Sequence, residues 1–109
     1  MNKNSKIFIA GNGLVGKALY KILSEKGYSR ITTISKAKLD LRNQKNVNDW
    51  FQANSPEYVL NAAAKVGGIN YNALAPADFI YDNLLIQSNL IDSSFKNNVK
   101  KFLFLGLVS

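Results

Sequence analysis

Short apolar runs alternate along the chain with longer segments in which apolar residues recur every three or four positions. The short runs are rich in β-branched and aromatic residues, which is typical of buried parallel strands. They predict strands over residues 6–10, 30–35, 58–60 and 101–105. The longer segments predict amphipathic helices over residues 14–23, 46–53 and 77–97, and Gly27 is placed as the C-terminal stop of the first helix. Because strands that alternate with helices indicate βαβ units with right-handed crossovers, we expect an α/β fold whose parallel sheet carries helices on both faces.

The length of the chain limits the number of domains. Its 109 residues suffice for one domain with a modest core and leave no room for a second. The chain ends almost directly after the fourth predicted strand, so the sheet would have an uncovered edge there. We therefore expect a single partial domain over residues 1–109, truncated after the fourth strand.

Composition excludes several classes of enzyme. The sequence has no Cys and no His, which excludes a disulfide framework, a thiolate zinc site, a Ser-His-Asp triad and the common metal-ligand sets. No apolar run approaches the roughly 18 residues of a membrane helix, and the first five residues are polar. The sequence therefore predicts neither a metal site, a membrane span nor a signal peptide, and we expect a cytoplasmic protein.

The formal net charge of +7 is confined to the first part of the sequence. Residues 1–45 contain ten basic and two acidic residues, whereas residues 46–109 contain four basic and five acidic ones. We expect an anionic ligand to bind the first part. The alternative is that a chain rich in Lys, Asn and Ile has a basic surface without a binding role. Nucleic acid is disfavoured as the ligand, because the basic part lacks interleaved aromatic residues and any helix-turn-helix pattern.

A glycine pattern, G-x-G-x-x-G, follows the first strand directly and opens the first helix. It consists of Gly11, Asn12, Gly13, Leu14, Val15 and Gly16. In dinucleotide-binding proteins the first glycine allows a tight turn, the second lets the pyrophosphate approach the backbone, and the third lets helix and strand pack closely. The helix N-terminus adds free N–H groups and a partial positive charge. We predict that these six residues bind a dinucleotide. The alternative is a glycine turn with no ligand.

The end of the second strand predicts which dinucleotide is bound. NAD-binding proteins carry an Asp or Glu there that accepts a hydrogen bond from the ribose 2′-hydroxyl, but this chain has Lys36 at that place. A cation suits a 2′-phosphate, so NADP is favoured over NAD. The alternative is that Lys36 and Lys38 are simply solvated. Asp40, with Leu41 beside it, is a further candidate: it could accept from the adenine amine, or it could be an N-cap or turn residue.

Four segments carry a resemblance to a known family. They are Ala-Ala-Ala-Lys-Val-Gly-Gly-Ile at residues 62–69, Pro-Ala-Asp-Phe-Ile-Tyr-Asp-Asn at 76–83, Ser-Asn-Leu-Ile at 88–91 and Lys-Phe-Leu-Phe-Leu-Gly at 101–106. Together they resemble the GDP-L-fucose synthases, which belong to the extended short-chain dehydrogenase/reductases. The first two segments are much more specific than the glycine pattern, and the resemblance covers essentially the whole chain.

The resemblance implies an NADPH-dependent enzyme with two steps. GDP-4-keto-6-deoxy-mannose is epimerised at C3 and C5, and a hydride then reduces the C4 ketone to give GDP-L-fucose. The resemblance further implies that Lys36 meets the 2′-phosphate and that Asn83 sits in the long helix starting at Ala77, beside the catalytic strand. It also implies that this helix and its neighbour form a homodimer contact in the full-length protein, although the apolar residues of the helix could equally be a stripe that only faces the sheet. It places a third group of cofactor-binding residues after the third strand: Ala62, Ala63, Ala64 and Lys65. Small side chains there would avoid the dinucleotide, although a tightly packed strand end would favour them too.

The chain also departs from the family that it resembles. After the fourth strand the family reads Gly-Ser-Ser-Cys-Ile-Tyr-Pro and later carries Tyr-x-x-x-Lys and a His, which perform the proton transfers. This chain reads Gly-Leu-Val-Ser at 106–109 and ends. Its glycine loop is one residue shorter than the family's and has Asn12 in a gap that usually holds an Arg. We expect a cofactor-binding N-terminal fragment that is catalytically incomplete and has no catalytic residue. The alternative is a non-catalytic module that binds or senses NADP(H).

Overall fold

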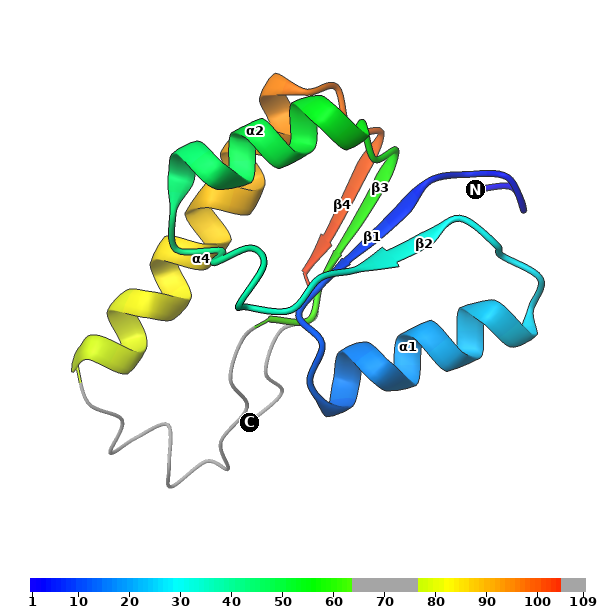
Figure 1. Cartoon of the computed structure of the whole chain (residues 1–109), viewed down its shortest axis with the longest axis horizontal. Coiled ribbons are helices and arrows are strands. Elements are labelled where there is room, and N and C mark those ends of the chain that lie inside the picture. Colours follow the sequence, from blue (N-terminus) through cyan, green and yellow to red (C-terminus); the bar gives the residue numbers. More distant parts are fainter. Residues whose placement is uncertain (64–76, 105–109) are drawn as a thin grey trace.

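The computed structural model describes residues 1–63 and 77–104, which form four strands and three helices (Figure 1). The strands are β1 (Ile7–Ala10), β2 (Ile31–Thr33), β3 (Tyr58–Asn61) and β4 (Lys101–Phe104). The helices are α1 (Leu14–Glu25), α2 (Gln44–Asn54) and α4 (Ala77–Lys96). All seven elements were predicted from the apolar pattern, and no predicted end differs from the observed one by more than two residues. None of these helices is both long and apolar enough to cross a membrane.

The strands form one parallel sheet in the order β2-β1-β3-β4. Register is continuous across the middle of the sheet: Ile9 of β1 lies opposite Thr33 of β2 and Leu60 of β3. Helix α1 covers one face, and α2 and α4 lie together over the other (Figure 1). This arrangement confirms the predicted Rossmann-like α/β fold with helices on both faces.

The core lies between the sheet and the α2–α4 layer. Strand β1 is buried along its whole length, which explains why its sequence is a continuous apolar run. Phe8 packs its ring 4.2 Å from that of Trp50 and edge-on against Phe51, at 5.8 Å. Val59 of β3 and Leu90 of α4 complete this layer, and both are fully buried. Contacts of this kind tie α2 and α4 to the two central strands.

Helix α1 ends as its sequence predicts. Gly27 adopts a φ of +96°, which L-residues with a side chain rarely reach. The amide of Tyr28 donates to the carbonyl of Leu23, and that of Gly27 donates to Ser24. These two bonds form a Schellman motif that satisfies the last carbonyls of the helix. The predicted stop at Gly27 is therefore confirmed.

Both α1 and α4 leave apolar side chains in water. Gly16 is the only fully buried residue of α1, and Leu14 is 87% exposed. In α4 the apolar positions divide between two faces: Ile86 and Leu90 pack on the core, whereas Leu84 and Phe95 are exposed. The apolar pattern of α4 is therefore wider than a stripe that only faces the sheet.

Candidate functional site

Three strands end at the same edge of the sheet, and the segments that follow them form the candidate site. Gly11 follows β1, Ile34 follows shortly after β2, and Ala62 follows β3. The start of α1 and the loop from β2 to α2 lie at this edge in Figure 1. Successive strands are added outward in one direction from β1 to β2 and in the other from β3 to β4. In open parallel sheets such a reversal marks the crevice where ligands bind.

Two glycines of the loop are required by packing within the protein. Gly11 has a φ of +100°, and a Cβ there would lie 2.7 Å from the backbone of Ala62 and Ala63. A Cβ on Gly16 would lie 2.1 Å from the carbonyl oxygen of Gly11. Both distances are too short for any real side chain. Gly11 therefore lets the loop after β1 touch the segment after β3, and Gly16 lets α1 start directly against that loop.

Gly13, the middle glycine, differs from the other two. Among the described residues, a Cβ on Gly13 would meet no atom within 4 Å, and its φ of −78° is open to any residue. Gly13 is also the N-cap of α1, which has no side-chain capping bond and no acidic residue in its first turn. The first-turn amides of Leu14, Val15 and Gly16 therefore lack a capping side chain, at the positive end of the helix dipole. An anion that approached Gly13 would meet these donors.

The loop after β2 brings basic residues to the same edge. The carbonyl of Ser35 accepts hydrogen bonds from the amides of Lys38 and Leu39, both at 3.0 Å, so the chain turns sharply here. This turn explains why β2 is shorter than the predicted strand. Lys36 and Lys38 are both exposed. The charge of Lys36 contributes to lowering the pKa of Asp40, which places the ammonium group within electrostatic reach of that carboxylate.

Asp40 is held by Arg42, two residues further along. One carboxylate oxygen accepts from the backbone amide and Nε of Arg42, both at 3.0 Å, and the other accepts from its terminal nitrogen at 2.8 Å. These hydrogen bonds lower the pKa of Asp40 to about 2 and raise the pKa of Arg42 above its ordinary range. The N-cap alternative for Asp40 is wrong, because Asn43 caps α2 by accepting from the amide of Asn46. Asp40 is a turn residue with a charged partner.

Helix α4 fixes this loop from the other side. The side-chain amide of Asn89, which is 4% exposed, donates to the carbonyl of Leu41 at 3.0 Å. A second nitrogen of Arg42 lies 3.4 Å from the carboxylate of Asp82. Asn83, the next residue of α4, is half-buried. The loop that carries Asp40 and Leu41 is thus bound to α4 by a buried amide and an ion pair.

The segment after β3 completes the described part of the site. The amide of Ala62 donates to the carbonyl of Ala10, which extends the β1–β3 pairing to the edge of the sheet. Asn61 is 1% exposed, and its side-chain oxygen accepts from the amide of Ala63 at 3.0 Å. This bond turns the chain immediately after the strand. Ala64 and Lys65, which were also predicted to bind the cofactor, lie outside the described residues.

The structure brings together most of the predicted residues and adds three. The glycine loop, Lys36, Asp40, Leu41, Ala62 and Ala63 all lie on segments at the carboxyl edge of the sheet. No role for Asn61, Arg42 or Asn89 was predicted from the sequence. Asn61 had a sequence signal, since it is a polar residue at the end of an apolar strand. Arg42 and Asn89 had none, because their partners on the opposite segment lie 40 and 48 residues away.

Comparisons with known proteins agree with this fold. Residues 7–108 match the model of the NAD dependent epimerase/dehydratase family. GDP-L-fucose synthase 1 of Arabidopsis thaliana is 49% identical over 106 residues, which are 96% of this chain and 33% of that protein. GDP-L-fucose synthase of Escherichia coli is 42% identical over 102 residues, 93% of this chain and 32% of that protein. The chain therefore spans about a third of the length of these relatives.

A solved structure resembles this chain in both sequence and fold. It is a GDP-mannoheptose C4 reductase from Campylobacter jejuni with NADP bound, which superposes with a TM-score of 0.87 at 45% identity and covers 95% of this chain and 31% of that one. The order of the strands and the glycine loop after β1 are those of a dinucleotide-binding domain, which is consistent with the family match. This chain belongs to the NAD dependent epimerase/dehydratase family.

Proposed function

We propose that this chain is the cofactor-binding N-terminal part of an NADP-dependent GDP-sugar epimerase/reductase. The observation that carries the proposal is the contrast among the three glycines of the loop. Packing within the protein accounts for Gly11 and Gly16, whereas no contact among the residues that the structure describes requires a glycine at position 13. The open space beside Gly13 and the uncapped start of α1 fit a pyrophosphate group.

The described residues can hold each part of NADP. The amides of Leu14, Val15 and Gly16 would bind the phosphates, and Lys36 would bind the 2′-phosphate. The backbone at Ala62 and Ala63 would run beside the dinucleotide, and their small side chains leave room for it. NADPH, when bound, supplies a hydride. The chain's own contribution is to bind and orient the cofactor.

Titration of the chain with NADPH and NADH tests the cofactor assignment. We expect NADPH to bind at least about tenfold more tightly, which corresponds to roughly 1.4 kcal/mol for a single charge-assisted contact. Replacing Lys36 by Ala should remove most of this preference. Lys45→Ala is a matched control, because Lys45 is an exposed cation on α2 whose partner is Asp49. Equal affinities of the wild-type chain for NADPH and NADH contradict the assignment of Lys36.

The reaction is proposed for a protein about three times as long, as the relatives are. Its substrate would be a GDP-linked 4-keto sugar, GDP-4-keto-6-deoxy-mannose, and its product GDP-L-fucose. The test is to translate the DNA beyond codon 105 in all three forward frames. We expect the sequences Cys-Ile-Tyr-Pro and Tyr-x-x-x-Lys in one of them. If neither occurs, the catalytic part of the proposal is wrong and cofactor binding remains. A cytoplasmic location stays a prediction.

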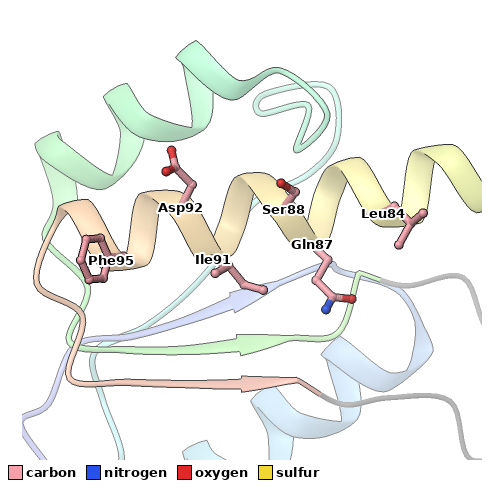
Figure 2. A pocket seen from close by; sticks show the side chains of 6 residues that line it. All are labelled: Leu84, Gln87, Ser88, Ile91, Asp92 and Phe95. Carbon is pink, nitrogen blue, oxygen red and sulfur yellow. The ribbon is translucent and has the colours of Figure 1, made fainter.

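A homodimer contact on α4 is the second part of the proposal. Phe95 and Leu84 are 85% and 63% exposed, and Ile91 is 45% exposed. Figure 2 shows them along the helix with Gln87, Ser88 and Asp92, around a surface pocket of about 550 Å³. Large apolar side chains gathered on one face are typical of an interface. The proposed partner is a second copy of the protein, as the family resemblance implies.

Sedimentation velocity over a range of concentrations tests this contact. We expect the wild-type chain to show a concentration-dependent dimer and Phe95→Glu to stay monomeric, because the change places a charge on the apolar face. Lys21→Glu, at an exposed position of α1, is a control that should leave the dimer intact. A wild-type chain that is monomeric at every concentration contradicts the contact.

A further inference from the structure

Arg42 joins the loop after β2 to helix α4. Its Nε and one terminal nitrogen bind the carboxylate of Asp40, and its other terminal nitrogen lies 3.4 Å from the carboxylate of Asp82. The three side chains are each about 40% exposed, at 38%, 37% and 42%. The planar guanidinium group is suited to this geometry because it presents its donors in a fixed fork. Arg42 thus connects two segments that lie 40 residues apart in the sequence.

The backbone around Arg42 is held as well. Leu41, the preceding residue, offers its carbonyl to the buried side chain of Asn89. The following residue, Asn43, donates its amide to the carbonyl of Asp40 and caps α2 with its side chain. Every residue from Asp40 to Asn43 therefore has a polar partner. The conformation of this segment is set before a ligand arrives, which lowers the entropic cost of binding.

Asp40 retains capacity to accept a further hydrogen bond. An ionised carboxylate has about four acceptor sites, and Arg42 supplies only three donor groups, with its Nε shared between the two oxygens. The side chain is also 37% exposed at the carboxyl edge of the sheet. A dinucleotide whose pyrophosphate lies at the glycine loop extends its adenosine end toward the end of β2. The free side of Asp40 is thus available to the adenine base.

We propose that Arg42 is a positioning residue for adenine recognition: it orients the Asp40 carboxylate to accept from the exocyclic amine of the base, and Asp82 in turn orients Arg42. The inference rests on the proposed function, since it requires a dinucleotide at the glycine loop. It assigns roles to two residues that neither the glycine pattern nor the charge of the chain singles out.

The test compares two ligands that differ only in the group that Asp40 would recognise. NADPH carries the adenine amine, and its analogue with unsubstituted purine as the base carries a hydrogen atom in that place. We expect the wild-type chain to bind NADPH about tenfold more tightly than the analogue, as for one hydrogen bond to a charged group. In Arg42→Met the affinity for NADPH should fall about tenfold, while the affinity for the analogue stays within about twofold.

Three further variants separate positioning from charge and from folding. Arg42→Lys keeps the charge but not the fork, and should lose most of the preference for NADPH. Asp82→Asn leaves the Asp40–Arg42 pair intact and should lose part of the preference for NADPH. Lys45→Met removes a cation from an exposed site on α2 and should change neither affinity. The affinities of all variants are measured at one temperature, which is low enough for every variant to be folded.

Each outcome decides the inference. The inference is supported if the preference for NADPH over the analogue decreases in Arg42→Met and Arg42→Lys but not in Lys45→Met. Equal losses of affinity for both ligands mean that Arg42 acts only through general folding or charge, and the inference is then wrong. A wild-type chain that binds both ligands equally also overturns it and leaves the proposed function standing. A wild-type chain that binds neither ligand overturns the proposed function itself.

Discussion

Replacing Gly13 by Val separates cofactor binding from folding. A Cβ at this position would meet no atom of residues 1–63 or 77–104 within 4 Å, and the backbone is extended, with φ of −78° and ψ of −159°. Valine is a poorer N-cap than glycine, at a cost of up to about 1 kcal/mol. The reduced freedom of the unfolded chain offsets about 0.4–1 kcal/mol of that cost. The free energy of unfolding should therefore stay within about 1 kcal/mol of the wild-type value.

The effect on cofactor affinity should be far larger. The valine methyl groups would occupy the space through which a phosphate reaches the first-turn amides of α1. A hydrogen bond to a charged group contributes about 1.5–3 kcal/mol, so the loss of two such bonds weakens binding by about 3–6 kcal/mol. Because about 1.4 kcal/mol corresponds to a factor of ten, the affinity for NADPH should fall at least a hundredfold.

Isothermal titration with NADPH and chemical denaturation of the same samples measure the two quantities. Gly13→Ala should give a smaller loss of affinity, since it adds one methyl group. Ala18→Val adds similar bulk at an exposed position of the same helix and should leave both quantities unchanged. A folded Gly13→Val chain that binds NADPH with wild-type affinity would refute the assignment of the pyrophosphate to this loop.

Three other predictions concern stability. Gly16→Ala places a methyl group 2.1 Å from the carbonyl oxygen of Gly11, so we expect a loss of about 2 kcal/mol or more in chemical denaturation; an unchanged midpoint contradicts this packing. Ser93→Ala removes a fully buried hydroxyl that has no hydrogen-bond partner among the described residues, and should raise the melting temperature by several degrees, about 1 kcal/mol; a lower melting temperature means that the hydroxyl is satisfied. Asp40 has a folded-state pKa of about 2 against an ordinary 3.8, so its pairing with Arg42 stabilises the fold above pH 4 and this contribution is lost as the pH falls from about 4 to 2. Denaturation midpoints across that range should fall less steeply in Arg42→Met than in the wild type, and parallel curves contradict the ion pair.

Local patterns predict the elements of this fold well, because each strand and helix depends on its own apolar period. The end of α1 at Gly27 could be predicted because only glycine readily adopts the positive φ found there. The close contact of α1 with the loop after β1 could be predicted because Gly16 has no side chain. The length of β2 does not follow from its sequence, since the turn at Ser35 ends the strand although Ile34 has strand propensity. The exposure of Leu14 could not be predicted either, since a helical period does not show how wide the covering layer is.

The candidate site is predictable to the extent that it lies close to a strand end. Gly11, Lys36 and Ala62 each follow a predicted strand, and parallel strands bring their carboxyl ends to one edge. The partners that hold the site in shape are different. Arg42 contacts Asp82, and Asn89 contacts Leu41, across segments that only the folded chain brings together. Tertiary contacts of this kind leave no periodic signal in one sequence.

The contrast among the three loop glycines has a consequence for how divergent relatives are judged. Gly11 and Gly16 are needed to bring backbone against backbone, so a descendant that had lost its cofactor would still have to retain them in order to fold. No contact in the described part of the chain requires Gly13, so this glycine can be replaced once the ligand is no longer bound. In a family with this geometry, the two outer glycines indicate only that the fold is retained, whereas the middle glycine indicates that the nucleotide is still bound.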